Sequence, residues 1–326
     1  MHPEDAVAEL DTGYLGIPGA AAVFLVRAPG APVLVETGCA ATFEAVRAGL
    51  AAHGVAPRDL AAVLVTHVHL DHAGAAGHFA REGVPVLVHP RGARHLADPA
   101  RLIAGSRAVH GPRYDAHYGD PLPIDPARIR AIEDGDSAEL GGWRFEAIAT
   151  PGHARHHHAW LAGPAGLPPR ELFAGDVLGM VTPGSRFIAI PAPPSDIDLA
   201  AWRASLARIA ALPGGLRCLL THGGGRPLAP HLAEFTARFD EETALLAGLV
   251  QTDDAGGNGG GNDGGNDGGN MDAEAADRRY RDFLAPRIAA AGVRDELAAS
   301  LLGRAFRAMN IAGVAEAVRR ATRVEE

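Results

Sequence analysis

The sequence predicts a layered α/β fold in which strands end in polar side chains that can ligate metal ions. Between residues 20 and 222, short apolar runs typical of buried strands alternate with segments of helical periodicity. Several of these apolar runs are followed closely by histidine or aspartate. Because the carboxyl ends of strands in an open α/β sheet lie on one rim, we expect these side chains to form a single site.

Composition limits the class of protein. The chain has 326 residues, of which 47% are hydrophobic, enough for one large domain or two ordinary ones. A formal net charge of −9, without basic runs in the sequence, argues against nucleic acid or an anionic membrane surface as partner. The two cysteines, Cys39 and Cys218, favour free buried thiols and a cytoplasmic location. We find no signal-peptide pattern and no apolar run of the ~18 residues that a membrane span needs.

The first predicted elements lead to an acidic side chain at a strand end. Residues 20–27 and 32–36 have the composition of two strands joined by a hairpin turn. Glu36 closes the second strand, where it either orients a ligand or is an exposed acid, and the sequence leaves both interpretations open. A helix is expected over residues 41–53, because their apolar side chains recur at helical spacing.

The densest group of polar side chains follows the next strand, residues 61–65. Three imidazoles and a carboxylate occupy six positions there, and small residues typical of a helix start come next: His67, His69, Asp71 and His72. Side chains alternate in an extended segment, so His67 and His69 point the same way and can bind one cation. Asp71 and His72 come after the turn and can face a second position. Nitrogen and oxygen ligands at this density suit zinc, iron or manganese.

Two stretches rich in proline and glycine, residues 104–127 and 183–195, interrupt the pattern. The first contains too many of these residues for a long helix or strand and is either a loop over the site or a surface connector. Before it, residues 84–88 form another predicted strand. The other histidines near the motif are interpreted as structural: His78, His89 and His95.

Three later predicted strands are each followed by a candidate metal ligand. The strand at 142–150 leads through a Pro-Gly turn to His153. A short apolar strand at residues 172–174 leads to Asp176, and the strand at residues 216–221 leads to His222. The adjacent histidines that follow the first of these turns cannot all face one ion, so at least two are assigned to packing or to supporting contacts: His156, His157 and His158.

The rest of the chain is predicted to be helical apart from one linker. Ser195 and Asp198 fit a capping box that starts a helix with a core stripe ending at Leu212. A further helix is expected over residues 232–250. We expect a catalytic domain over residues 1–250, a disordered Gly/Asn/Asp linker over residues 251–270, and a helical extension of two or three helices over residues 271–326.

The pattern His-x-His-x-Asp-His, here His67, His69, Asp71 and His72, resembles the signature of the metallo-β-lactamase superfamily. This resemblance implies a four-layer αββα sandwich, with two mixed sheets back to back, helices outside and a helical C-terminal appendage. It also implies three further ligands in chain order: His153, Asp176 and His222. Glu36 stands where the superfamily usually has an aspartate that supports the metal site. The C-terminal helices resemble those of glyoxalase II-like members by position only.

The resemblance implies two Zn²⁺ ions, with iron or manganese as alternatives. One ion would lie on His67, His69 and His153, the other on Asp71, His72 and His222, with Asp176 bridging them. Two cations about 3.5–4 Å apart lower the pKa of a shared water to about 7 and polarise a carbonyl. We therefore expect hydrolysis of an acyl bond in a small molecule, a thioester or lactone ahead of a β-lactam, with Asp71 also considered for proton transfer.

Other activities stay open at this point. A mononuclear iron enzyme of the persulfide dioxygenase type shares the implied fold, and two histidines with a carboxylate suit its chemistry. A flavin-linked oxygen reductase would need a carboxylate where His69 stands, and a non-enzymatic binding protein would normally lack some of the ligands. The sequence does not decide whether the chain forms a homodimer, and it does not name the substrate.

Overall fold

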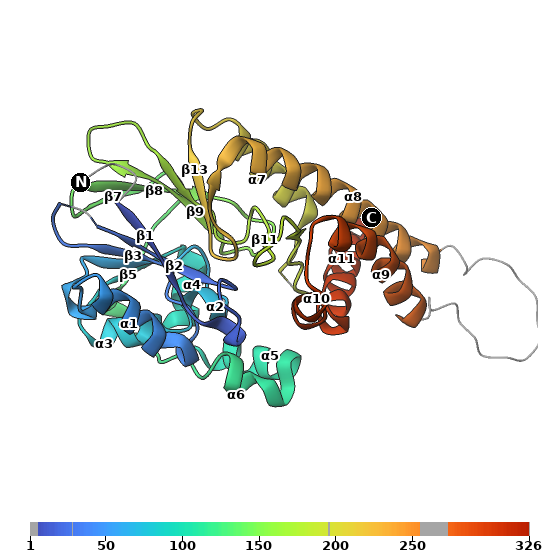
Figure 1. Ribbon diagram of the computed structural model, residues 1–326, viewed down its shortest axis with the longest axis horizontal. Coiled ribbons are helices and arrows are strands. Elements are labelled where there is room, and N and C mark those ends of the chain that lie inside the picture. The colour runs from blue at the N-terminus through green and yellow to red at the C-terminus, as the bar shows by residue number, and fades with distance from the viewer. Residues whose placement is uncertain (1–5, 28, 195, 255–272, 326) are drawn as a thin grey trace, which may run out of the picture.

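The protein folds as two six-stranded sheets packed face to face, with helices on both outer sides (Figure 1). This computed structural model describes residues 6–27, 29–194, 196–254 and 273–325. The first sheet contains β1 (Val7–Asp11), β2 (Ala22–Val26), β3 (Val33–Val35), β4 (Ala62–Leu64), β5 (Val86–Val88) and β6 (Ile129–Ala131), in that spatial order. The predicted four-layer αββα class is confirmed.

The second sheet has the spatial order β14-β13-β10-β9-β8-β7. Its strands are β7 (Ser137–Leu140), β8 (Trp143–Ala149), β9 (His158–Pro164), β10 (Glu171–Phe173), β13 (Arg217–Leu220) and β14 (Gly224–Pro227). A separate two-stranded ribbon joins β11 (Met180–Val181) to β12 (Ile188–Ala189). Both sheets are mixed, since β3 to β6 run parallel and β10 pairs parallel with β13, whereas the remaining pairs are antiparallel.

The helices divide into two groups by their place in the chain. The segments between strands of the first sheet contain α1 (Phe43–Ala52), α2 (Leu70–Ala73), α3 (Ala76–Arg81), α4 (Pro90–Ala97), α5 (Ala100–His110) and α6 (Tyr114–His117). The second group contains α7 (Leu199–Ala210), α8 (Leu228–Asp254), α9 (Ala273–Ala290), α10 (Asp295–Leu301) and α11 (Arg304–Glu325). Short 3-10 turns are η2 (Tyr14–Gly16), η3 (Ala40–Thr42), η4 (Pro57–Asp59), η5 (Gly111–Arg113) and η6 (Pro126–Arg128).

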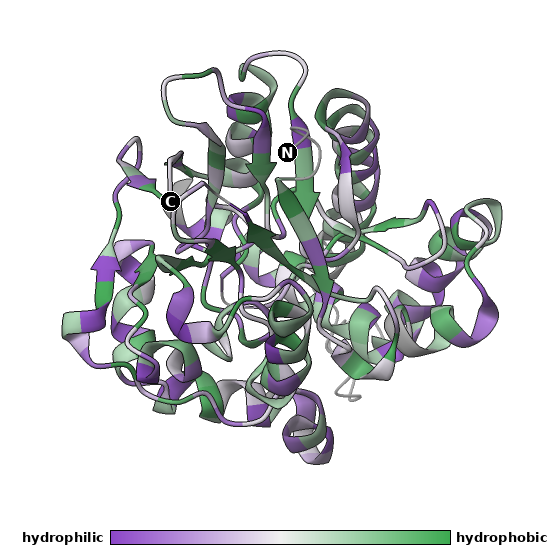
Figure 2. Cartoon of the chain, turned by 60° about the vertical axis from the view of Figure 1, so that its left-hand side comes forward, coloured by the Kyte–Doolittle hydropathy of each residue, from purple (hydrophilic) through white to green (hydrophobic). Residues whose placement is uncertain are grey.

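Alternation along the central strands builds three layers of core. On β2, Phe24 joins the core between the two sheets, whereas Val23 and Leu25 pack against the helices outside the first sheet. On β10, Phe173 faces the first sheet and Leu172 faces the other way, toward the cluster that includes α7 and α8. Both faces of these strands are buried, so they appear as continuous apolar runs in the sequence and in Figure 2.

The structure adds local detail to the expected elements. The stretch 104–127 contains the end of α5 and the short α6, and it holds no long helix or strand, as expected. Gly105 sits in open space within α5, where glycine costs only ~1 kcal/mol relative to alanine, and Gly111, at φ +54°, follows the last residue of α5. The strand β1 was not predicted, because as an edge strand it buries only Leu10 deeply.

Two differences from the expectations concern the start of α7 and the end of α8. The capping residue is Asp198, whose carboxylate accepts a hydrogen bond from the Ala201 N–H, and Ser195 lies outside the described residues. The helix α8 continues to Asp254, past residue 250 where we expected the linker to begin. The remainder of the expected linker, residues 255–270, also lies outside the described residues, so the division into domains stays a prediction.

The C-terminal helices pack on α8 and on the segment that follows β12 (Figure 1). Buried Asn310 of α11 accepts a hydrogen bond from the Ala192 N–H and donates to the carbonyl of Ile190 and to the hydroxyl of Tyr280. An added Cβ at Gly313 would lie 2.0 Å from the Ala192 oxygen, so glycine permits this close approach. Among the described helices, none is long and apolar enough to cross a membrane.

Replacement of Asn310 by alanine should destabilise the protein by about 2–4 kcal/mol, because it leaves the buried N–H of Ala192 and the carbonyl of Ile190 without their partner. Urea denaturation gives the free energy of unfolding. Thr322→Ala on the same helix removes one exposed hydrogen bond and should change stability by about 0.5 kcal/mol or less. Equal stability of N310A and the unmodified chain would contradict the role assigned to this contact.

Candidate metal centre

The metal-ligand motif begins where β4 leaves the first sheet. The carbonyl of Val65 accepts hydrogen bonds from His158 Nε2 and Trp160 Nε1, both at 3.1 Å, which fixes the point of departure. His69 follows in extended backbone, and α2 begins at Leu70. The change from extended to helical backbone lets the motif contribute to more than one group of ligands, although the ring centroids of His67 and His72 lie only 4.0 Å apart.

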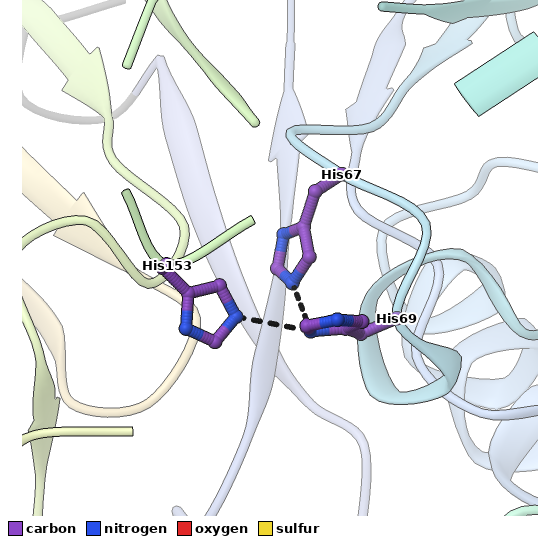
Figure 3. A group of neighbouring side chains, drawn as sticks. All are labelled: His67, His69 and His153. Carbon is purple, nitrogen blue, oxygen red and sulfur yellow. Dashed lines mark hydrogen bonds between the residues drawn. The ribbon is translucent and has the colours of Figure 1, made fainter. Parts of the chain in front are cut away.

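Three imidazoles converge in the first group, His67, His69 and His153 (Figure 3). His69 Nδ1 lies 3.0 Å from His67 Nε2 and 3.0 Å from His153 Nε2. A single proton can satisfy only one of these two contacts, whereas one cation can be shared by all three nitrogens. The turn before His153 requires glycine, since Gly152 has φ +143° and an added Cβ would lie 2.3 Å from Trp202 Cβ.

The second group consists of Asp71, His72 and His222, with Asp176 between it and the first group. His222 Nε2 lies 3.2 Å from Asp71 Oδ2, and His72 Nε2 lies 3.3 Å from Asp176 Oδ1. The other oxygen of Asp176, Oδ2, lies 3.5 Å from His153 Nε2. Asp176 therefore contacts both groups with different oxygens.

Three buried atoms of the second group lack hydrogen-bond partners within the described part of the chain: His72 Nε2, Asp176 Oδ1 and His222 Nε2. They approach one another at 3.3 to 3.9 Å without the alignment of hydrogen bonds. Buried polar atoms are nearly always paired, so these three atoms need a partner that no described side chain supplies. The imidazole and carboxylate donors around it fit a divalent cation.

Hydrogen bonds behind four of the histidines aim their Nε2 lone pairs at the site. Carbonyl oxygens only accept, so His153 Nδ1 donates to Pro191 at 2.9 Å and His222 Nδ1 donates to Ala20 at 2.7 Å. Nδ1 of His72 lies 3.2 Å from the carboxylate of Glu36. Nδ1 of the fourth, His67, contacts the Thr66 hydroxyl at 3.0 Å. With the proton on Nδ1, each ring presents Nε2 as a ligand.

The electrostatic environment differs between the two groups. Burial lowers the pKa of His67 and His69 and lowers that of His153 to about 4, so these rings are neutral and ready to bind a cation. For His72 and His222, burial opposes the charged form, but the nearby carboxylates outweigh it and raise the pKa. A cation entering the second group therefore displaces protons, whereas one entering the first does not.

The pKa values of the two aspartates shift downward, opposite to those of His72 and His222. Burial disfavours the charged forms of Asp71 and Asp176, yet the neighbouring His72 and the other imidazoles hold the pKa of both aspartates below the usual range. Both are therefore ionised at neutral pH and available as ligands.

The profile of the Metallo-beta-lactamase superfamily matches residues 16–222. This chain belongs to that superfamily. A hydroxyacylglutathione hydrolase of Pseudomonas aeruginosa (strain LESB58) is 33% identical over 207 residues, 61% of this chain and 64% of the relative. A metallo-beta-lactamase fold-containing protein of Sulfurisphaera tokodaii is 30% identical over 150 residues, 45% of this chain and 54% of the relative. The chain thus spans between about half and two thirds of the length of these curated relatives.

Solved structures of the superfamily share the fold. A metallo-beta-lactamase family protein from Thermus thermophilus superposes with a TM-score of 0.62 at 21% identity, covering 97% of this chain and 94% of that one. An archaeal superfamily member from Sulfolobus tokodaii gives a TM-score of 0.57 at 23% identity, covering 73% and 86%. The first of these likenesses extends over the C-terminal helices as well as the two sheets.

Glu36 lies behind the candidate metal-ligating histidines of this superfamily member rather than in solvent. Its Oε1 accepts a hydrogen bond from the Thr66 hydroxyl at 2.5 Å and contacts His72 Nδ1 at 3.2 Å, and Oε2 accepts from the Thr66 N–H. Since Thr66 donates to Glu36, its hydroxyl oxygen is free to accept from His67 Nδ1. One carboxylate thus orients a histidine of each group, and the interpretation as an exposed acid is wrong.

The three adjacent histidines have separate roles, and at least two are supporting, as predicted. His157 contacts the Thr150 hydroxyl with Nδ1 and accepts from the Asp176 N–H with Nε2, which holds the bridging aspartate in place. His158 holds the Val65 carbonyl. His156 instead lies near His69, on the outer side of the first group. Sequence reasoning gave no means to assign these roles, because each partner comes from a distant segment.

The stretch 104–127 reaches the site through one residue. Tyr118 accepts a hydrogen bond from the hydroxyl of Tyr14 at 2.8 Å, and the ring of Tyr14 lies 6.0 Å from that of His222. Of the two interpretations of this stretch, a segment beside the site fits better than a remote connector. Of the histidines interpreted as structural, His78 stacks on Phe43, and His89 accepts from the Arg91 N–H at the start of α4.

Replacement of Glu36 by glutamine should weaken metal binding by about 10–100-fold. The two donors of Thr66 and the Nδ1–H of His72 all need an acceptor, and glutamine offers one oxygen and an NH₂ group that cannot accept. Competition with a chromophoric chelator measures the affinity. Glu44→Gln on exposed α1 is the matched control. Unchanged affinity in E36Q would show that Glu36 does not orient the ligands.

Proposed function

We propose that this superfamily member is a metal-dependent hydrolase that cleaves an acyl bond, a thioester or lactone, in a small molecule. The observation that carries the proposal is the contact of Asp176 with both ligand groups, since it allows two cations to share one carboxylate. A relative at 33% identity is, by its name, a hydrolase of an acylated glutathione, which supports the same reaction type.

The residues would divide between two Zn²⁺ ions, with iron or manganese as alternatives. His67, His69 and His153 would hold the first ion. The second ion would lie on Asp71, His72 and His222, and Asp176 would bridge the two. When bound, such a pair supplies hydroxide from water near neutral pH and polarises the carbonyl that is attacked.

The side chains of the site contribute proton handling and exclude other nucleophiles. Asp71 has a side chain that is 19% exposed, against 5% for Asp176, so it is the ligand carboxylate that can pass a proton to solvent. Burial, together with the charge of Asp71, raises the pKa of the Cys39 thiol well above its usual value. A buried neutral thiol is a poor nucleophile, which leaves water as the attacking group.

The C-terminal helices belong to the same catalytic unit in this proposal. Asn310 of α11 holds both neighbours of Pro191, and the carbonyl of Pro191 accepts the hydrogen bond that orients His153. The extension over residues 271–326 would thus support a metal ligand as well as pack on the catalytic domain, residues 1–250.

The proposal predicts about two metal ions per chain and hydrolysis of thioesters or lactones that a chelator abolishes and added Zn²⁺ or Mn²⁺ restores. Asp176→Ala should lose metal and activity together, because the bridging carboxylate is removed. Asp240→Ala, at an exposed site on α8, is the control and should keep both. Elemental analysis measures the metal content of each variant, and a panel of thioesters and lactones measures its activity.

Two results would contradict this function. One is a chain with its full metal content that hydrolyses no thioester or lactone. The other is a chain with one iron that consumes oxygen when given a persulfide, which would identify the mononuclear dioxygenase chemistry instead.

A further inference from the structure

A pocket of about 470 Å³ lies beside the first imidazole group. Four arginines from three separate elements line it, together with two histidines: Arg91 and Arg94 of α4, Arg101 of α5, Arg155 from the turn after β8, His95 and His156. The pocket falls within the range of roughly 300–1,000 Å³ that small-molecule sites usually occupy. It can therefore accommodate part of a substrate or a small ligand.

The pocket shares a wall with the metal centre. The ring of His156 lies 5.7 Å from that of His69 and 6.1 Å from that of His67, measured between centroids. Ligand atoms of His156, His69 and Asp196 all lie within 4.8 Å of one another. A molecule with one end in this pocket would thus have its other end at the proposed site of acyl cleavage.

The four arginines of the pocket have no ion-pair partner in the described part of the chain. No carboxylate there, that of Asp196 included, lies within ion-pairing distance of their guanidinium groups. The single acidic residue that lines the pocket, Asp196, approaches His156 at 3.8 Å. This concentration of positive charge stands out in a chain with a formal net charge of −9.

The choice of arginine over lysine is not evidence for an anion site, because the chain has no lysine. The evidence is that four arginines from separate elements line one pocket. Like charges brought to one concavity repel unless a bound anion compensates them, and guanidinium groups bind phosphate or carboxylate oxygens in pairs of parallel hydrogen bonds. Arg91 and Arg94 are three positions apart on α4, which places them on one face of that helix.

We infer that this arginine pocket binds an anionic group, a phosphate or a carboxylate, carried by the substrate at some distance from the acyl bond. The inference rests on the proposed acyl hydrolase function and narrows its substrates to acyl compounds with a negatively charged end. The pocket positions that end, and the reaction takes place at the adjoining metal centre.

The first test measures anion binding without reference to activity. Inorganic phosphate is titrated calorimetrically into the full-length, metal-loaded chain at constant ionic strength. The double variant Arg94→Gln with Arg155→Gln should bind phosphate about tenfold more weakly or worse at equal metal content, since charge-assisted hydrogen bonds are lost. Arg58→Gln is the control. Arg58 lies on η4, before the start of β4, whereas the metal-ligand motif follows the end of that strand. Equal affinity in all three proteins overturns the inference.

The second test identifies the anion and its role in turnover. Thioesters of one acyl chain that ends in a carboxylate, a phosphate or a neutral methyl ester are compared by kcat/KM. The ratio of anionic to neutral substrate should fall about tenfold in the double variant, and R155K should lie between. The anion with the larger fall is the one the pocket recognises. An unchanged ratio, even with phosphate binding lost, overturns the substrate role.

The two tests separate two kinds of failure. If no thioester or lactone is hydrolysed by any of the proteins, the proposed function fails, while the phosphate titration still decides whether the pocket binds anions. Circular dichroism confirms that the exposed glutamine substitutions leave the fold intact.

Discussion

The metal centre depends on hydrogen bonds made by the rear nitrogens of its histidines. His153 and His222 donate to backbone carbonyls, and His67 and His72 connect to Glu36, directly or through Thr66. These bonds fix where each proton lies and therefore which nitrogen faces inward. Without them the same rings could rotate or change tautomer, and the unpaired atoms of the second group would have no common focus. Loop residues next to the strands supply the acceptors for these bonds.

The fold provides those acceptors from distant segments. Ala20 comes before β2, and Pro191 comes after β12, where Asn310 of the C-terminal helices holds both of its neighbours. The two sheets bring the ends of β4, β8, β10 and β13 to one rim, and each end leads to a candidate metal ligand. Packing and chemistry are thus coupled, because a shift of α11 would move the Pro191 carbonyl and with it His153.

Much of this arrangement could be predicted because the information is local. Short continuous apolar runs located the central strands, and the two-residue spacing of His67 and His69 predicted that their side chains lie together, as they do. Contacts between distant segments could not be predicted in this way. The position of Glu36 behind two histidines and the convergence of four arginines on one pocket depend on tertiary packing. The extent of α5 was not predictable from Gly105 either, since a single exposed glycine costs a helix little.

The central claim is that two cations lie between these side chains and share Asp176. A crystal structure of the metal-loaded chain, with anomalous data collected on both sides of the absorption edge of the bound metal, tests it most directly. The account predicts two peaks about 3.5–4 Å apart, one against His67, His69 and His153 and the other against Asp71, His72 and His222. A single peak, or peaks away from these residues, would contradict it.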